Sequence, residues 1–209
     1  SAVIDASNSS QYVSAVLLAA PYAAQDVRLS FVDGVLVSRP YVDLTLQIMR
    51  EFGAEAGWEK DGSLRVAAGK PYSGRDYTIE PDASSAIYPF CAAAIAGGRV
   101  RVRGIPQDSL QADFAVLPLL ERMGCTVSRT ADYTEVQGPT TTLRSLERID
   151  LNPLPDAALA LAVVALFADG PTLIENVANL RIKETDRLAA LETELRRMGA
   201  RAEAGPDWL

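Results

Sequence analysis

Three stretches of the chain share one pattern, a polar opening followed by an apolar run rich in alanine. They read SNSSQYVSAVLLAAPYA from Ser7, PDASSAIYPFCAAAIAGG from Pro81 and PDAALALAVVALFADG from Pro155. The second opening lies as far from the first as the third lies from the second. The glycines that close three later amphipathic segments keep nearly the same spacing. Two independent markers with one period indicate an internal repeat.

Each repeat predicts the same order of elements. A short strand comes first, and we expect it at residues 3–5, 77–80 and 148–151. A helix that is apolar on nearly all sides follows, and such helices are normally buried. A second strand comes next, at residues 27–32, 99–104 and 172–177. An amphipathic helix and, in repeats one and two, an alternating hairpin complete the order β-α-β-α-β-β. We expect repeat three to be truncated, with Leu209 inside the first strand of its hairpin.

The amphipathic helices each carry one apolar stripe. In repeat three the stripe consists of Leu188, Leu191, Leu195 and Met198, which is typical of a helix packed on one face. Each of these helices is followed by a glycine, which adopts the left-handed C′ conformation at low steric cost. Pro118 falls inside the helix expected in repeat two, and there we expect a kink or a later start.

A polar stretch separates the first repeat from the other two. Residues 69–77 read GKPYSGRDY and contain one proline and two glycines. Such a composition is typical of a domain boundary or hinge. We therefore expect residues 1–73 to belong to one domain and residues 74–209, with repeats two and three, to another.

Composition narrows the classes of function. The formal net charge is −7, which argues against nucleic-acid binding, because that requires a basic face. The chain has no histidine, the commonest metal ligand and general base, and we expect no metal and no cofactor. No apolar run is long enough to span a membrane. The two cysteines are not spaced as Cys-x-x-Cys, so we expect a reducing, cytoplasmic location.

The polar openings are candidate anion sites, because a helix N-terminus carries free N–H groups and partial positive charge. Repeat one opens with Ser9, Ser10 and Gln11, which could cradle a phosphate or carboxylate or simply cap the helix. Asp156 in repeat three could accept a proton from a substrate hydroxyl or be a cap. Repeat two has the same Pro-Asp step at Asp82, and a repeated feature favours the structural interpretation.

The segment KETDR, residues 183–187, carries an unusual density of charge at the start of a helix. Cations are electrostatically unfavourable at that position, and a bound anion would relieve the conflict. Arg187 is suited to bidentate capture of a carboxylate or phosphate, with Lys183 and Glu184 beside it. Surface ion pairs that contribute little are the alternative. Residues 38–41, SRPY, occupy the same place in repeat one.

These motifs together resemble the EPSP synthase family of enolpyruvyl transferases. The resemblance is carried by SSQ at 9–11, SRPY at 38–41, DASSA at 82–86, SLQAD at 109–113, PDAALALAVVALFADG from 155 and NLRIKETDR at 179–187. It implies an α+β fold, an inverse α/β prism built from repeated βαβαββ units. Residues 1–73 would be the last unit of the N-terminal domain, and residues 74–209 the first two units of the C-terminal domain.

The resemblance also implies a reaction, the transfer of the enolpyruvyl group from phosphoenolpyruvate to the 5-hydroxyl of shikimate 3-phosphate with release of phosphate. It assigns Asp156 and Glu184 as catalytic residues. Contacts to shikimate 3-phosphate would come from Ser9, Ser10, Gln11, Ser38, Tyr41, Asp156, Asn179 and Lys183. Contacts to phosphoenolpyruvate would come from Gln11, Glu184 and Arg187.

Two alternatives remain open at this point. The chain could belong to an enolpyruvyl transferase that acts on UDP-N-acetylglucosamine, or to a non-catalytic scaffold whose polar openings are only caps. The expected partners are small anionic substrates, without nucleic acid or membrane. Other site residues of the family lie outside these 209 residues, so we expect the isolated chain to need the remainder of the enzyme and to be inactive alone.

Overall fold

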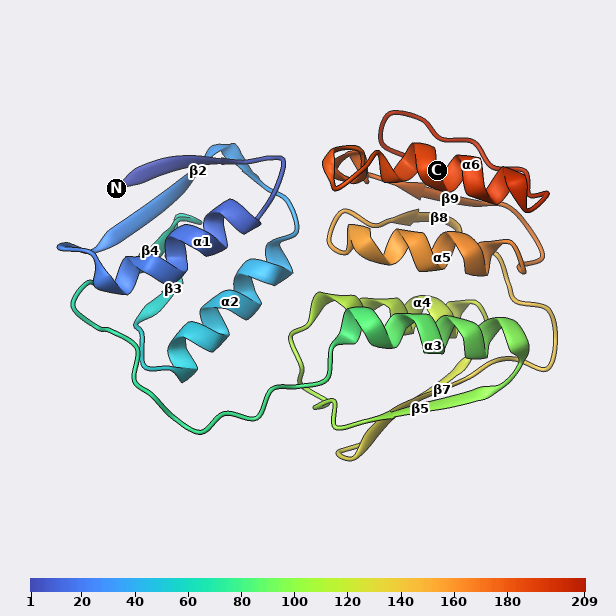
Figure 1. Cartoon of the computed structure of the whole chain (residues 1–209), viewed down its shortest axis with the longest axis horizontal. Helices are drawn as coiled ribbons and strands as arrows, with labels where there is room; N and C mark the ends of the chain where they lie inside the picture. The colour runs from blue at the N-terminus through green and yellow to red at the C-terminus, as the bar shows by residue number, and fades with distance from the viewer. The chain divides into compact units, whose positions relative to one another are not determined.

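A computed structural model describes all residues from 1 to 209. The chain forms two compact units, Ser1–Thr78 and Ile79–Leu209, here named the N-terminal unit and the C-terminal unit (Figure 1).

The N-terminal unit contains one complete repeat. Its elements are β1 (Ala2–Ala6), α1 (Gln11–Ala19), a 3₁₀ turn (Ala20–Tyr22), β2 (Val27–Leu36), α2 (Arg39–Glu51), β3 (Ala56–Trp58) and β4 (Leu64–Val66). The four strands form one sheet in the order β1-β2-β4-β3, in which β1 and β2 are parallel and the other pairs antiparallel. This is the β-α-β-α-β-β order that the repeat predicts.

The two helices of this unit lie side by side on one face of the sheet (Figure 1). The hydroxyls of Ser14 and Thr45 join them at 2.8 Å, and Val13, Leu17 and Leu46 pack into the core beneath. Each helix follows one of the two parallel strands, so both helix N-termini lie at the same end of the unit. That end carries the polar residues of the first repeat.

The C-terminal unit contains repeats two and three. Its elements are α3 (Ala83–Ala96), β5 (Arg99–Arg103), α4 (Val116–Arg122), β6 (Thr126–Arg129), β7 (Tyr133–Gln137), β8 (Glu147–Asp150), α5 (Ala158–Ala165), β9 (Thr172–Glu175) and α6 (Arg187–Arg197), with 3₁₀ turns at Ala112–Ala115, Pro155–Ala157 and Ala178–Ile182. The sheets are β5-β7-β6, which is antiparallel, and β8-β9, which is parallel. One core, with Phe90 of α3 and Leu161 of α5, connects both repeats.

The strand expected at residues 77–80 is wrong. Residues 70–82 form no regular element, because this stretch finds partners other than a neighbouring strand. The Tyr77 ring lies 5.3 Å from the Phe52 ring, and the Glu80 carboxylate accepts hydrogen bonds from Ser109 and Gln111. The segment therefore connects the units instead of adding to a sheet.

The expected end of repeat three also needs correction. Trp208 and Leu209 lie beyond the hairpin turn, not in its first strand. Leu209 exchanges backbone hydrogen bonds of 2.8 and 2.9 Å with Ile174 of β9, and the Val177 N–H donates to the Asp207 carbonyl. Repeat two pairs in the same way, since the Gly104 N–H donates to the Asp132 carbonyl just before β7, the second strand of its hairpin, begins. A sequence alternation alone does not locate the turn.

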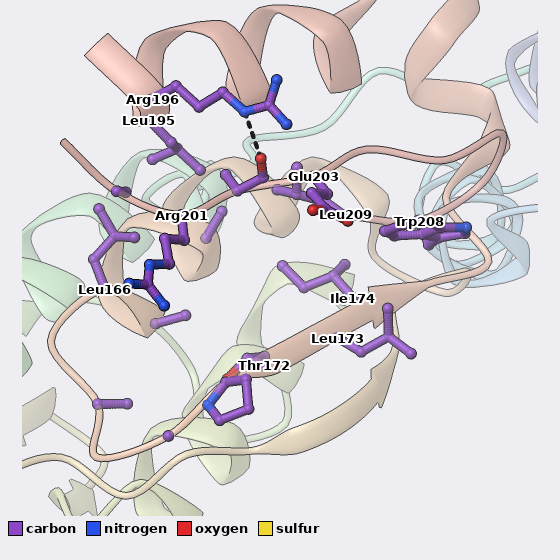
Figure 2. A pocket seen from close by; sticks show the side chains of 17 residues that line it. Leu166, Thr172, Leu173, Ile174, Leu195, Arg196, Arg201, Glu203, Trp208 and Leu209 are labelled. Carbon is purple, nitrogen blue, oxygen red and sulfur yellow. Dashed lines mark hydrogen bonds between the residues drawn. The ribbon is translucent and has the colours of Figure 1, made fainter. Parts of the chain in front are cut away.

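A hollow of about 840 Å³ lies beside β9, between the ends of α5 and α6 (Figure 2). Its lining is mostly apolar, with Leu166, Ile174 and Leu195, and Arg201 and Trp208 stand at its rim. None of its lining residues is a candidate site residue from the sequence.

Pro118 delays the helix of repeat two, as predicted. The chain first makes a 3₁₀ turn at Ala112–Ala115, and α4 begins only at Val116. Pro118 thus falls in the first turn of α4, where its missing N–H would have no intrahelical acceptor in any case.

Both cysteines are buried free thiols. Burial raises the pKa of Cys91 to about 12, with Cys125 adding to the effect, and burial raises the pKa of Cys125 to about 11. Both therefore stay protonated at neutral pH. Since the thiolate is the nucleophile, neither cysteine is a candidate for covalent chemistry.

Thr134 of β7 provides a test of the core. Its side chain faces inward, fully buried, and its hydroxyl has no hydrogen-bond partner. An unsatisfied buried hydroxyl costs about 1–3 kcal/mol, and valine has the same shape. We expect Thr134→Val to raise the free energy of unfolding by about 1 kcal/mol in urea denaturation. Thr126→Val, at an exposed position of the neighbouring strand, is the control and should change it by less than about 0.5 kcal/mol. A less stable T134V protein would show that the hydroxyl has a partner.

Candidate functional site

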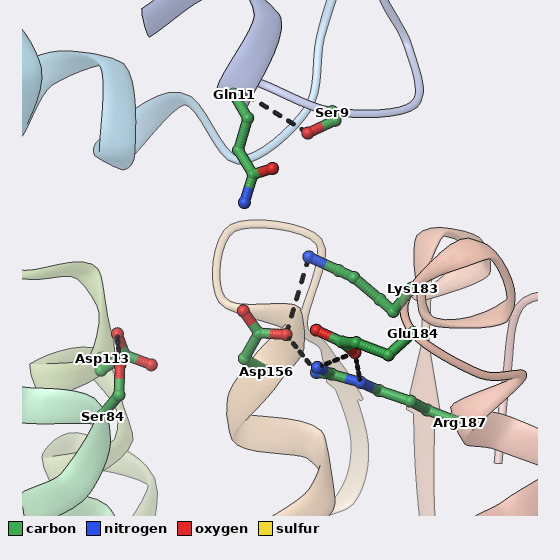
Figure 3. Close-up of polar contacts among 8 residues, drawn as sticks. All are labelled: Ser9, Gln11, Ser84, Asp113, Asp156, Lys183, Glu184 and Arg187. Carbon is green, nitrogen blue, oxygen red and sulfur yellow. Dashed lines mark hydrogen bonds and ion pairs between the residues drawn. The ribbon is translucent and has the colours of Figure 1, made fainter. Parts of the chain in front are cut away.

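The N-terminus of α1 presents the polar residues of repeat one. Ser10 is the N-cap residue and is buried, yet no side-chain hydrogen bond caps the helix. The Ser9 hydroxyl accepts the Gln11 N–H at 3.2 Å, and the Gln11 side chain is exposed (Figure 3). The helix end therefore keeps the partial positive charge that attracts anions.

Ser38 precedes α2 at the same end of the N-terminal unit. It adopts the left-handed conformation, with φ 52° and ψ 41°, and it is 9% exposed. This conformation costs an L-residue about 1–2 kcal/mol and is common at functional sites. Tyr41 follows one helical turn later and donates its N–H to the Ser38 carbonyl at 3.1 Å. The backbone thus holds Ser38 in place without using its hydroxyl as a cap.

Arg39, the cation of the SRPY motif, is held by contacts within the N-terminal unit. The Arg39 guanidinium lies 4.2 Å above the Trp58 ring and 3.8 Å from the Asp43 carboxylate. Trp58 in turn donates its indole N–H to Asp43 at 2.7 Å. Arg39 is therefore anchored on the unit itself.

In the C-terminal unit, Asp156 meets the charged segment 183–187 (Figure 3). Because β8 and β9 are parallel, the turns that follow them lie at one end of the sheet. Arg187 Nη1 donates to Asp156 Oδ1 at 2.7 Å, and Lys183 Nζ lies 3.7 Å from the same oxygen. Arg187 Nε also donates to Glu184 at 3.0 Å. The structure thus brings together four of the residues that the sequence singled out.

The two Pro-Asp steps of the chain serve different purposes. Asp82 caps α3 by accepting the N–H groups of Ser84 and Ser85, and the Ser85 hydroxyl together with these groups lowers the pKa of the Asp82 carboxyl. The Gln111 side chain closes the same helix end by accepting the Ala83 N–H at 2.7 Å. By contrast, no side chain caps α5 or the 3₁₀ turn before it, and Asp156 turns to the cations of the 183–187 segment.

Exposure and charge differ among the four clustered side chains. Asp156 is 38% exposed, Arg187 21% and Glu184 76%. The Glu184 backbone N–H, followed by the Arg187 side chain, lowers the pKa of the Glu184 carboxyl. Two cations and two carboxylates balance each other, so an incoming anion must compete for Arg187 with an exposed and easily displaced Glu184.

A hollow of about 400 Å³ adjoins this cluster. Asp156, Thr185, Arg187 and Glu194 form its polar side, and Tyr88 and Leu191 are among the rest of its lining. The sequence does not single out Tyr88, because nothing in the apolar run of α3 distinguishes a residue that lines this hollow from one in the core.

Asn179 lies in the 3₁₀ turn that connects β9 to the 183–187 segment. Its side-chain oxygen is buried and has no hydrogen-bond partner. A buried acceptor without a partner costs about 1–3 kcal/mol, and a hydrogen-bond donor that gained access to this oxygen would remove that cost.

The model of the family described as EPSP synthase (3-phosphoshikimate 1-carboxyvinyltransferase) matches residues 1–209. The chain belongs to the EPSP synthase family. It is 46% identical over 207 residues to the 3-phosphoshikimate 1-carboxyvinyltransferase of Yersinia ruckeri and 45% identical over 206 residues to that of Nostoc punctiforme. Each comparison covers 99% of this chain and 48% of the relative. The chain thus spans about half the length of these curated relatives.

Solved structures confirm the predicted fold. EPSP synthase from Acinetobacter baumannii superposes with a TM-score of 0.74 at 24% identity, covering 99% of this chain and 47% of that one. The enolpyruvyl transferase NikO from Streptomyces tendae gives 0.60 at 22% identity, covering 75% and 37%. The family resemblance predicted from the motifs is likewise confirmed.

No group of three or more histidine, cysteine, aspartate or glutamate side chains is arranged to hold a metal ion. No helix combines the length and the apolar character that crossing a bilayer requires.

Proposed function

We propose that this chain supplies about half of the active site of a 3-phosphoshikimate 1-carboxyvinyltransferase. The reaction transfers the enolpyruvyl group of phosphoenolpyruvate to the 5-hydroxyl of shikimate 3-phosphate and releases phosphate. The observation that carries the proposal is the position of Asp156. Unlike the carboxylate of Asp82, that of Asp156 does not cap a helix. It lies 2.7 Å from Arg187 and 3.7 Å from Lys183.

Both substrates are anions, so binding requires cations and oriented donors. Arg187 would hold phosphoenolpyruvate, and its planar guanidinium suits a carboxylate or phosphate. Glu184 would give up its contact to Arg187 at little packing cost, because it is 76% exposed. Lys183 and Asn179 would contact shikimate 3-phosphate. The unpaired oxygen of Asn179 supports a hydrogen bond from a substrate hydroxyl.

The chemistry needs proton transfers in both directions at the enolpyruvyl group. The 5-hydroxyl loses a proton as its oxygen attacks, and the methylene carbon gains one. The C–O bond to phosphate then breaks, phosphate leaves, and the new methyl group gives up a proton, which restores the double bond. Asp156 would accept the first proton. Glu184, the second carboxylate of the cluster, would take part in acid–base exchange near phosphoenolpyruvate. The cations beside them would stabilise the charge that develops.

The N-terminal unit would supply the other contacts to the phosphorylated substrate. Ser9, Ser10 and Gln11 belong to a helix end that the side chain of its N-cap residue, Ser10, does not cap. Such an end favours anion binding, and Gln11 would also reach phosphoenolpyruvate. Ser38 and Tyr41 would contact the ring or its phosphate. A strained, buried Ser38 with no capping role supports this assignment. Residues outside this chain would complete the site, and a cytoplasmic location without nucleic-acid or membrane partners stays part of the proposal.

The test is phosphate release by a polypeptide of full family length that contains residues 1–209, hereafter the full-length enzyme. We expect release when shikimate 3-phosphate and phosphoenolpyruvate are both present, and none when UDP-N-acetylglucosamine replaces shikimate 3-phosphate. The isolated chain should release none. Release with UDP-N-acetylglucosamine would establish the alternative transferase, and no binding of either acceptor by the full-length enzyme in a calorimetric titration would support the scaffold.

A further inference from the structure

We propose that Arg181 is a positioning residue that holds the 183–187 segment in its active geometry. The inference rests on the proposed function, because that segment supplies Lys183, Glu184 and Arg187 to the site. Arg181 belongs to the same charged stretch, but neither the motif assignments nor the cluster around Asp156 gives it a role.

The guanidinium of Arg181 is fully engaged in contacts within the chain. Its Nη1 donates to Asp186 Oδ2 at 2.6 Å, its Nε donates to the Pro206 carbonyl at 2.9 Å, and its Nη2 donates to the Gly205 carbonyl. All three nitrogens thus have protein acceptors, and the side chain is 30% exposed. Arg181 therefore bridges two segments of the unit instead of facing a ligand.

One of these segments is the start of α6. Asp186 is the N-cap residue, and its Oδ1 accepts the Ala189 N–H at 3.0 Å while Oδ2 accepts Arg181. The Ala189 N–H, with Arg181 adding to its effect, lowers the pKa of the Asp186 carboxyl. The first helical residue after this cap is Arg187. Fixing the cap therefore fixes the direction in which Arg187 reaches Asp156.

The other segment is the turn before Trp208, and it is held firmly. The Gly205 N–H donates to the Trp208 carbonyl, and the Val177 N–H donates to the Asp207 carbonyl, both at 2.9 Å. A Cβ at Gly205 would lie 2.0 Å from the Trp208 indole nitrogen, so the ring packs directly on this glycine. The hydrogen bonds of Arg181 thus connect the N-terminus of α6 to a turn that is itself hydrogen-bonded to β9.

Hydrogen bonds that hold the start of α6 from outside the site matter, because catalytic groups tolerate little displacement. A misplacement of about 1 Å can cost on the order of 100-fold in rate. In metal sites, where the comparable supporting contacts orient the ligands, losing one typically costs about 10–100-fold. We therefore expect Arg181→Ala in the full-length enzyme to lower kcat/KM for phosphoenolpyruvate by about 10–100-fold. Arg197→Ala, which removes an exposed pair with Glu194 on the same helix, is the control and should stay within about twofold.

A double-mutant cycle separates positioning from direct binding. If Arg181 acts through Arg187, Arg181→Ala should cause little further loss in an Arg187→Ala background. If Arg181 binds substrate itself, the two losses should add, and that result would overturn the proposal. Arg181→Gln, which keeps a polar side chain but cannot bridge both segments, is the second variant in case Arg181→Ala does not fold.

Amide hydrogen exchange gives a readout that does not depend on turnover. Exchange at Ala189 should become faster in the Arg181 variants and stay unchanged in the Arg197 control. If the proposed reaction is wrong, the unmodified enzyme will not release phosphate, while the exchange result still holds. Unchanged exchange and kcat/KM within twofold in both folded Arg181 variants would contradict the positioning role.

Discussion

Replacement of Asp156 by asparagine is expected to lower kcat of the full-length enzyme by at least about 100-fold, the size typical of removing a general base. Asparagine keeps the shape and the hydrogen-bonding capacity of the side chain but cannot accept the proton of the 5-hydroxyl. Steady-state phosphate release at saturating concentrations of both substrates measures the effect.

Asp82→Asn is a matched control within the same chain. Both residues follow a proline at the start of a buried helix, but Asp82 caps α3. Asparagine caps a helix about as well as aspartate, so this variant should fold normally and keep kcat within about twofold. If Asp156→Asn retained similar activity, the carboxylate would not be the proton acceptor, and the site would need another base.

Truncation of Arg187 to alanine is expected to raise KM for phosphoenolpyruvate by about 100-fold or more, as for loss of a partly buried charged contact. The side chain is only 21% exposed and pairs with both Asp156 and Glu184. Its removal takes away the cation proposed for the substrate and leaves Asp156 with only Lys183, at 3.7 Å. Initial rates over a range of phosphoenolpyruvate concentrations give the value.

Two comparisons sharpen the interpretation of that result. Arg187→Lys keeps the charge but loses the planar fork, so a loss intermediate between the parent and the alanine variant would indicate bidentate recognition. Arg196→Ala removes a pair with Glu192 and a hydrogen bond to the Ala202 carbonyl, neither of which involves the cluster around Asp156. This control should leave KM within about twofold. An unchanged KM in Arg187→Ala would show that phosphoenolpyruvate is held elsewhere.

The repeat was the part of the fold that the sequence predicted best. The order of strands and helices, the buried apolar helices α3 and α5, and the hairpins of repeats one and two follow from local periodicity, which each element carries in its own residues. The apolar helix α1 is only partly buried, since Val16 and Leu18 are exposed. Both errors in the predicted strands concern pairing, which the periodicity of a segment does not specify. Residues 70–82 look like a strand but have no strand beside them. The end of repeat three does pair, but Leu209 pairs with Ile174 of β9, in the register of the second strand of the hairpin and not the first.

In the candidate site, too, the sequence predicted some of the contacts and only the structure shows the others. Residues 183–187 stood out because cations at a helix start are electrostatically unfavourable, and the structure shows carboxylates from two places that balance them. Arg181 lies just before this segment, in the motif NLRIKETDR, and the sequence assigned it no role of its own. Only the turn at Gly205 and Pro206, more than twenty residues later in the chain, shows that its guanidinium is occupied.

By itself, the sequence determined the repeated order of helices and strands, the family, and the group of residues that carry charge at the helix ends. It could not decide which of two identical Pro-Asp steps is a cap. The tertiary structure decides this, because a carboxylate at a helix start can satisfy either its own backbone or a cation from another element. At Asp82 the nearby groups are N–H donors of α3, and at Asp156 they are Arg187 and Lys183, which the parallel pairing of β8 and β9 brings to the same end.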